Sequence, residues 1–389
     1  MTGILKNYVG TRTADFTESI IREMTRRNNE VGGVNLAQGF PDFNPPHELI
    51  EAVVKAMADG YNQYSITWGS PRLRAAIAEK AAWYNGIQAN PDKNITVTCG
   101  ATEAMMATFM AIIDPGDEVI LFEPFYENYG PDAIVTGAKP VYVTLHEPDF
   151  TFDRDELRSA FSDRTKAIII NTPHNPSGKV FTREELEYIS ELCNEFDVLV
   201  ATDEIYEHIT YDGMAHISPA SVPGMENRTI TVNSVSKTYS ATGWRVGWTI
   251  APEEIANAIR KVHDFLTVGA PAPLQEAAVT ALRLPEQYYH DLASFYAEKR
   301  GLMMTALENA GFEVFKPRGA YYMLTDISSF GYADDMEFAL HLVENIGIAT
   351  VPGRGFYRNY EDARTKIRFG FCKQKETLHK AIERLAKLK

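Results

Sequence analysis

Short β-rich runs alternate with amphipathic helices through the middle of the chain, and this alternation constrains the fold more than any other feature. The runs predict strands at residues 95–98, 118–122, 166–171, 198–202, 229–233 and 246–251. Helices are predicted between them, at 102–113 and again after the capping box of Thr182 and Glu185. Strands that alternate with helices form mostly parallel sheets covered on both faces, so the sequence predicts an α/β fold.

The pattern changes after about residue 284. The elements expected there are a long helix, two short strands and a basic C-terminal helix, at 287–310, 321–325, 366–371 and the last residues. A chain of 389 residues is too long for one ordinary domain. We therefore expect a large domain over 46–286 and a smaller α+β domain from 1–45 and 287–389, because residues 34–42 look like a connector into the main sheet.

Composition excludes several classes of function. The chain has 38 basic and 52 acidic residues, a net charge of −14, which disfavours binding to nucleic acid. No run approaches the roughly 18 consecutive apolar residues of a membrane span. The cysteines Cys99, Cys193 and Cys372 are far apart and form no disulfide or metal pattern, and the first residues lack an apolar leader. We expect a cytoplasmic protein, and the nine histidines show no metal-ligand spacing, so no metal is expected.

Polar residues follow the predicted strands at the edge of the sheet where ligands of parallel sheets bind. Asn175, Asp203 and Ser234 each come after a strand. The segment Gly100-Ala101-Thr102 opens a helix, and the free N–H groups of a helix N-terminus suit a phosphate group.

A Ser/Thr/Gly-rich loop after residue 233 carries Lys237 and, eight residues later, Arg245. Taken singly, a loop lysine is usually solvated, a strand-end aspartate such as Asp203 is usually a helix cap, and Asn175 before a proline is usually a turn residue. Taken together, they provide an amine, a carboxylate, hydrogen-bonding groups and a phosphate cup. Pyridoxal 5′-phosphate (PLP) requires this set of groups.

The chain resembles the class I aminotransferases of PLP fold type I, the aspartate aminotransferase superfamily, nearly end to end. Two motifs, Asn35-Leu-Ala-Gln-Gly39-Phe-Pro-Asp42 and Asn171-Thr-Pro-His-Asn-Pro-Ser-Gly178, are most similar to the branch with kynurenine/glutamine and prokaryotic aspartate-type aminotransferases. The resemblance implies a large domain with a mostly parallel sheet and a smaller α+β domain. It also implies cis peptide bonds at Glu123-Pro124 and Asn175-Pro176.

The resemblance assigns roles around the cofactor ring. Lys237 is expected to form the Schiff base with PLP and then to move a proton between the substrate Cα and the cofactor. Asp203 is expected to pair with the pyridinium nitrogen, and Asn175 and Tyr206 to hydrogen-bond the ring oxygen O3′. Tyr126 is expected to stack on the ring, with the neighbouring Phe125 as a competitor for that position.

Other implied roles concern the phosphate and the substrate. The expected phosphate cup consists of Ala101, Thr102, Ser234 and Arg245. Tyr64 is expected to reach this phosphate from a neighbouring subunit, which predicts a homodimer. Arg368 is expected to bind the substrate α-carboxylate bidentately, and the N–H of Gly39 to add a second contact.

The predicted activity is ping-pong transamination between an L-amino acid and a 2-oxo acid. Aspartate is the first choice of donor and 2-oxoglutarate the expected acceptor. Aromatic, glutamine, kynurenine and LL-diaminopimelate donors remain open, as does a PLP-dependent C–S β-lyase or an aminocyclopropane carboxylate synthase relative. A non-enzymatic regulator that keeps PLP as a ligand is disfavoured, because such proteins usually carry a DNA-binding extension and the charge here is acidic.

Overall fold

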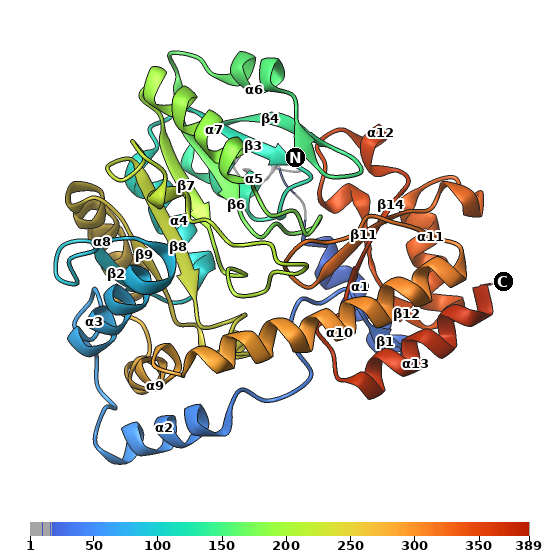
Figure 1. Ribbon diagram of the computed structural model, residues 1–389, viewed down its shortest axis with the longest axis horizontal. Coiled ribbons are helices and arrows are strands. Elements are labelled where there is room, and N and C mark those ends of the chain that lie inside the picture. The colour runs from blue at the N-terminus through green and yellow to red at the C-terminus, as the bar shows by residue number, and fades with distance from the viewer. Residues whose placement is uncertain (1–9, 11–15, 17, 389) are drawn as a thin grey trace, which may run out of the picture.

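The computed structural model describes residues 10, 16 and 18–388, and an eight-stranded sheet lies at its centre (Figure 1). The strand order is β2-β9-β8-β7-β6-β3-β4-β5. These strands span Ile95–Thr98 (β2), Glu118–Glu123 (β3), Lys139–His146 (β4), Thr151–Phe152 (β5), Thr165–Asn171 (β6), Leu199–Asp203 (β7), Thr229–Ser234 (β8) and Gly247–Ile250 (β9). Strands β4, β3, β6, β7 and β8 run parallel, while β9 and β5 are antiparallel to their neighbours. The predicted α/β class is confirmed.

All six predicted strands are present, but β4 and β5 were not predicted. Strand β4 lies near the edge of the sheet, where most of its residues are only half-buried or exposed. Its polar Lys139, Thr144 and His146 interrupt the apolar run that marks the central strands. A strand with little buried surface carries a weak hydrophobic pattern, and for this reason sequence inspection passed over it.

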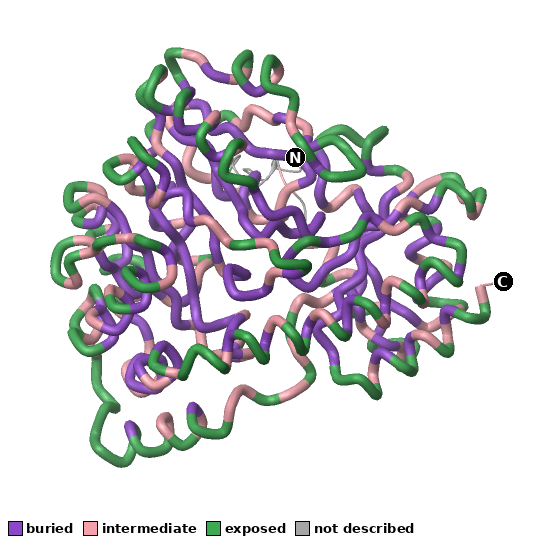
Figure 2. Tube along the Cα trace, in the orientation of Figure 1, coloured by how far each residue is buried: buried purple, intermediate pink, exposed green. Residues whose placement is uncertain are grey.

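Helices cover both faces of this sheet. They are α3 (Pro71–Lys80), α4 (Ala101–Ile112), α5 (Tyr129–Thr136), α6 (Arg154–Ala160), α7 (Arg183–Glu195), α8 (Glu253–Thr267) and α9 (Ala272–Leu282), with α2 (His47–Ala58) packed on α9. Side chains alternate along β3: Ile120 packs with residues of α6 and α7, whereas Val119 and Leu121 pack with residues of α4 and α5. The central strands are therefore buried on both sides (Figure 2). The predicted capping box of Thr182 and Glu185 begins α7.

A second group of elements surrounds a four-stranded antiparallel sheet of order β10-β11-β14-β13. Its strands span Glu313–Val314 (β10), Tyr322–Asp326 (β11), Val351–Pro352 (β13) and Lys366–Gly370 (β14). The helices beside it are α1 (Ile20–Val31), α10 (Glu286–Ala310), α11 (Asp335–His341), α12 (Tyr360–Ala363) and α13 (Lys375–Leu385). Figure 1 shows α10 running from the main sheet to this group.

The N-terminal segment returns to the C-terminal elements. Strand β1 (Val34–Asn35) pairs in parallel with β12 (Ile348–Ala349), and Met24 of α1 shares a hydrophobic core with residues of α10, α11 and α13. This packing agrees with the expected partnership of the two chain ends, and the division at 46–286 stays a prediction. Within the described part of the chain, no helix is both long and apolar enough to cross a bilayer.

Candidate active site

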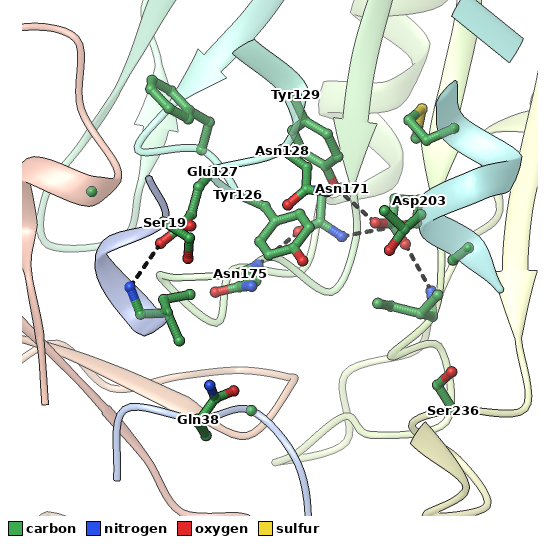
Figure 3. A pocket seen from close by; sticks show the side chains of 18 of the residues that line it. Ser19, Gln38, Tyr126, Glu127, Asn128, Tyr129, Asn171, Asn175, Asp203 and Ser236 are labelled. Carbon is green, nitrogen blue, oxygen red and sulfur yellow. Dashed lines mark hydrogen bonds between the residues drawn. The ribbon is translucent and has the colours of Figure 1, made fainter. Parts of the chain in front are cut away.

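A cavity of about 730 Å³ opens at the carboxyl ends of the parallel strands (Figure 3). All predicted site residues except Tyr64 line it: Gly39, Ala101, Thr102, Tyr126, Asn175, Asp203, Tyr206, Ser234, Lys237, Arg245 and Arg368. They follow the ends of β3, β6, β7 and β8, or come from the start of α4, the loop before β9, the N-terminal connector and β14. The two predicted cis peptide bonds, Glu123-Pro124 and Asn175-Pro176, are both present.

Asp203 is held in one orientation at the end of β7. Its Oδ2 accepts a hydrogen bond of 2.8 Å from the Tyr129 hydroxyl, and its Oδ1 accepts one of 3.3 Å from the N–H of Ile205. Burial raises the pKa of Asp203 to about 6, although these hydrogen bonds and the nearby Lys237 each lower it. A buried carboxylate that forms no salt bridge with the residues the structure describes suits a ligand that brings a positive charge.

Lys237 points into the same cavity. Its Nζ donates a hydrogen bond of 2.8 Å to the carbonyl of Gly39 and lies between the rings of Tyr206 and Tyr321, 5.8 and 5.7 Å from their centroids. Burial lowers the pKa of Lys237 to about 8, partly opposed by Cys372 and Asp203. Near neutral pH, about a tenth of this amine is therefore unprotonated and nucleophilic, far more than for a lysine with the usual pKa of about 10.4.

This pKa predicts the pH dependence of Lys237 chemistry in the cofactor-free protein. Only the neutral amine reacts, so modification by a small amine-directed reagent should rise as pH increases through about 8. Free lysine in the same solution should require a pH above about 10. Peptide mass spectrometry of Lys237 after timed labelling measures the profile. A midpoint near that of free lysine would show that burial does not depress its pKa.

Arg368 is 1% exposed and is held on two sides. One Nη donates to the Asn175 side-chain oxygen at 2.8 Å, and the other donates to the carbonyl of Ala37 at 2.6 Å. Its Nε has no hydrogen-bond partner among the residues that the structure describes. A buried guanidinium with no carboxylate partner among its hydrogen bonds suits an anionic ligand such as a carboxylate.

The start of α4 and the loop after β8 form a tight concave surface. A side chain at Gly100 would overlap the Arg245 guanidinium, and one at Gly247 would overlap the backbone of Gly100 and Ala101. Without Cβ atoms there, the guanidinium lies close to the first N–H groups of α4, which lack acceptors within the helix. Ser234 lines the cavity beside them. Backbone donors, a hydroxyl and a guanidinium fit a phosphate ester, so the residues present suit the phosphate of PLP.

Aromatic side chains complete the walls. The hydroxyls of Tyr206 and Tyr322 lie 3.1 Å apart, and Tyr126 points into the cavity near Asn175 (Figure 3). The competing ring of Phe125 also lines the cavity, but it packs on Tyr142 with a centroid distance of 5.4 Å. This geometry favours Tyr126 as the ring that stacks on a planar ligand.

Tyr64 is not brought into this cavity. Its side chain is 86% exposed, on the surface that also carries Ile66. The expected role in a neighbouring subunit requires such exposure.

Among the lining residues that the sequence analysis did not single out are Tyr129 and Tyr322. Tyr129 begins α5, and a backbone turn links it to Tyr126, with their rings in edge contact at 5.6 Å. The three-residue spacing from Tyr126 was an available signal. Tyr322 lies beside Gly39, and a Cβ at Gly39 would overlap the Tyr322 hydroxyl. No local sequence pattern predicts such a long-range contact.

Comparison with known proteins agrees with this geometry. Residues 31–385 match the family described as aminotransferase class I and II. The chain is 37% identical to a probable N-succinyldiaminopimelate aminotransferase of Mycobacterium tuberculosis, over 97% of this chain and 98% of the relative. It is also 37% identical to human kynurenine–oxoglutarate transaminase 1, over 94% and 95%.

The solved structure of N-succinyldiaminopimelate aminotransferase from Mycobacterium tuberculosis superposes with a TM-score of 0.95. Its sequence is 36% identical, and the match covers 98% of this chain and all of that one. The fold, the cavity and the family match therefore agree, and the chain belongs to the class I and II aminotransferases, enzymes that use pyridoxal 5′-phosphate.

Proposed function

We propose that the protein catalyses ping-pong transamination between an L-amino acid and a 2-oxo acid, with the cavity residues in the roles that the sequence predicted. One observation carries this proposal: an amine, a carboxylate, a carboxylate-binding guanidinium and a phosphate cup converge in one cavity. When bound, PLP supplies an aldehyde carbon for the amino group and a ring that accepts electrons from Cα.

The chain supplies position and charge. Asp203 would hold the proton on the ring nitrogen, and Asn175 and Tyr206 would hydrogen-bond the ring oxygen. Lys237 would remove and return the proton at Cα, a task that suits its pKa of about 8. Arg368 would hold the α-carboxylate so that the Cα–H bond faces Lys237.

Arg368→Lys tests the carboxylate contact. Lysine keeps the charge but loses the planar pair of donors, so we expect kcat/KM for amino acids to fall by about 10²-fold while cofactor affinity stays unchanged. Steady-state kinetics and titration of the cofactor-free protein measure the two quantities. Lys366→Arg, two residues earlier on β14, is a matched control. An unchanged kcat/KM would remove Arg368 from substrate binding.

The side-chain region of the cavity favours a large donor over aspartate. Ile20, Ile21 and Phe40 line it, while Arg354, a charged group that could meet a second carboxylate, is bonded to Asp335 at 2.6 Å. Two relatives are named for kynurenine and for N-succinyldiaminopimelate, and both of these amino acids have side chains larger than that of aspartate. We take donors of this size, with 2-oxoglutarate as acceptor, as the preferred substrates.

Aspartate, the first choice from sequence, becomes the second candidate. The observation that supports it is Arg22, an exposed residue of α1 that lines the same cavity and could meet a side-chain carboxylate.

The working form would be a cytoplasmic homodimer in which Tyr64 completes the partner's phosphate site. Residues 1–45 and 287–389 would form the smaller domain that closes over substrate.

A single-turnover panel tests the activity and the substrate class together. The purified protein loaded with PLP is mixed with one amino acid at a time, without an oxo acid. The rate of the spectral change gives kcat/KM for each amino acid, and the donors are ranked by this value. Kynurenine, methionine or an N-acylated diaminopimelate should rank above aspartate. Each should yield its own 2-oxo acid. Release of pyruvate and ammonia would instead identify a β-lyase, and no reaction with any donor would refute transamination.

A further inference from the structure

A buried histidine on α8 contacts two segments that have different roles in the proposed function: the start of α4, which forms the phosphate cup, and the segment that carries Tyr64. His263 has no exposed surface, and both ring nitrogens face oxygen acceptors. Nε2 lies 3.0 Å from the carbonyl of Thr67, and Nδ1 lies 2.8 Å from Oε1 of Glu103. A carbonyl can only accept, so Nε2 donates. The Thr267 hydroxyl, one turn later on α8, also lies 3.1 Å from Nδ1.

The first segment is the start of α4, which forms the predicted phosphate cup. Glu103 lies in its first turn, two residues after Ala101. The second carboxylate oxygen of Glu103 accepts a hydrogen bond of 2.8 Å from the N–H of Cys99. Glu103 therefore ties the loop before the helix to the helix itself, and His263 fixes the orientation of that carboxylate.

The second segment is 64–70, which presents the exposed Tyr64. Besides the contact of Thr67 with His263, the Thr67 hydroxyl donates to Asp264 at 3.3 Å, and Gln275 donates to the Ser65 hydroxyl at 2.8 Å. The carbonyl of Trp68 accepts from the N–H of Val97 on β2. All these anchors bind residues that follow Tyr64 within four positions in the sequence, so they restrain the backbone beside it, while the Tyr64 side chain is exposed.

The surface around this segment is apolar. Phe265 and Leu266 follow His263 on α8 and are 92% and 44% exposed, Val268 is exposed two residues later, and Ile66 is exposed next to Thr67 in the other segment. Large exposed apolar side chains grouped in this way are typical of a protein–protein contact. A second copy of this chain would place its own phosphate cup against Tyr64.

We propose that His263 is a positioning residue that holds the Tyr64 segment of one subunit and the phosphate cup of the same subunit in a fixed relation. The inference rests on the proposed function, in which Tyr64 reaches the partner's cofactor phosphate. Each subunit contributes two parts to the phosphate sites of the dimer: its own phosphate cup, and the Tyr64 that reaches the partner's phosphate. Through its contacts with Glu103 and Thr67, the His263 side chain positions both parts.

The test compares two ligands that differ only in the phosphate group. Cofactor-free full-length protein is titrated with PLP and, separately, with pyridoxal, and binding is followed by absorbance. His263→Gln and His263→Leu each remove the Nδ1–Oε1 contact with similar volume. Each variant should bind PLP about tenfold more weakly and pyridoxal with unchanged affinity. Equal weakening of both ligands, or no weakening of PLP, would overturn the proposal.

A second variant separates this inference from the assignment of Tyr64. Tyr64→Phe alone should weaken PLP but not pyridoxal, and if it does not, the role of Tyr64 fails whatever His263 does. If Tyr64→Phe weakens PLP and His263→Gln does not, only the positioning role fails. In the Tyr64→Phe background, the effect of His263→Gln should shrink, because residues that act through one another are not additive.

Controls address folding. His290→Gln, on the exposed face of α10, should change neither affinity. The urea midpoint of each cofactor-free variant is measured, and a variant that does not fold is replaced by the other, since either one removes the same contact.

Discussion

Lys237→Ala should abolish transamination and the visible absorbance of the lysine-bound cofactor. Among the described residues that line the cavity, Lys237 is the one lysine, so the substitution removes the amine that could bind the cofactor and with it the base predicted to act at Cα. Loss of a positioned general base costs up to about 10⁴-fold in rate, and loss of the covalent attachment removes the colour as well. Absorbance spectra and single-turnover kinetics measure both effects.

The matched control is Lys261→Ala, an exposed lysine on α8. It should retain colour and rate. Colour and turnover that survive in Lys237→Ala would show that another lysine holds the cofactor, and the roles assigned around this loop would have to be abandoned. Retained colour without turnover would place the attachment elsewhere and leave Lys237 with proton transfer alone.

Asp203→Asn should lower kcat by about 10²–10³-fold, a loss typical of removing one preorganised electrostatic contact. Asparagine has nearly the same shape but no charge, so it cannot keep the ring nitrogen protonated. The phosphate and ring-oxygen contacts remain, and cofactor should still bind. Measurement of kcat beside a PLP titration separates turnover from binding, and near-normal kcat would rule out the charge role of Asp203.

Tyr129→Phe provides a graded companion to this variant. It removes only the hydrogen bond to Asp203 Oδ2, which helps to lower the pKa of that carboxyl. In cofactor-free protein, the pKa of Asp203 should therefore rise above about 6. A protonated Asp203 cannot pair with a cationic ring. As the pH is lowered, PLP affinity should therefore begin to fall at a higher pH in this variant than in the unmodified protein. An unshifted pH profile would show that Tyr129 does not tune Asp203.

The fold could be predicted because its signals are local. Continuous apolar runs such as residues 166–171 mark strands buried on both faces, and the capping box at Thr182 marks the start of a helix. Strand β4 was not predicted because a strand next to the edge of the sheet buries too little apolar surface to carry the pattern. The placement of Asn175, Asp203 and Ser234 in one cavity follows from parallel strands, whose carboxyl ends share an edge.

The sequence alone determined the α/β fold, the family resemblance and the residue types available for chemistry, because these depend on periodicity and on short motifs. Only the tertiary structure decided which side chains meet across long separations. The Tyr129 contact with Asp203 spans 74 residues, that of Arg368 with Asn175 spans 193, and that of His263 with Thr67 spans 196. Such contacts form when packed layers bring distant segments together, and no local pattern in the chain records them.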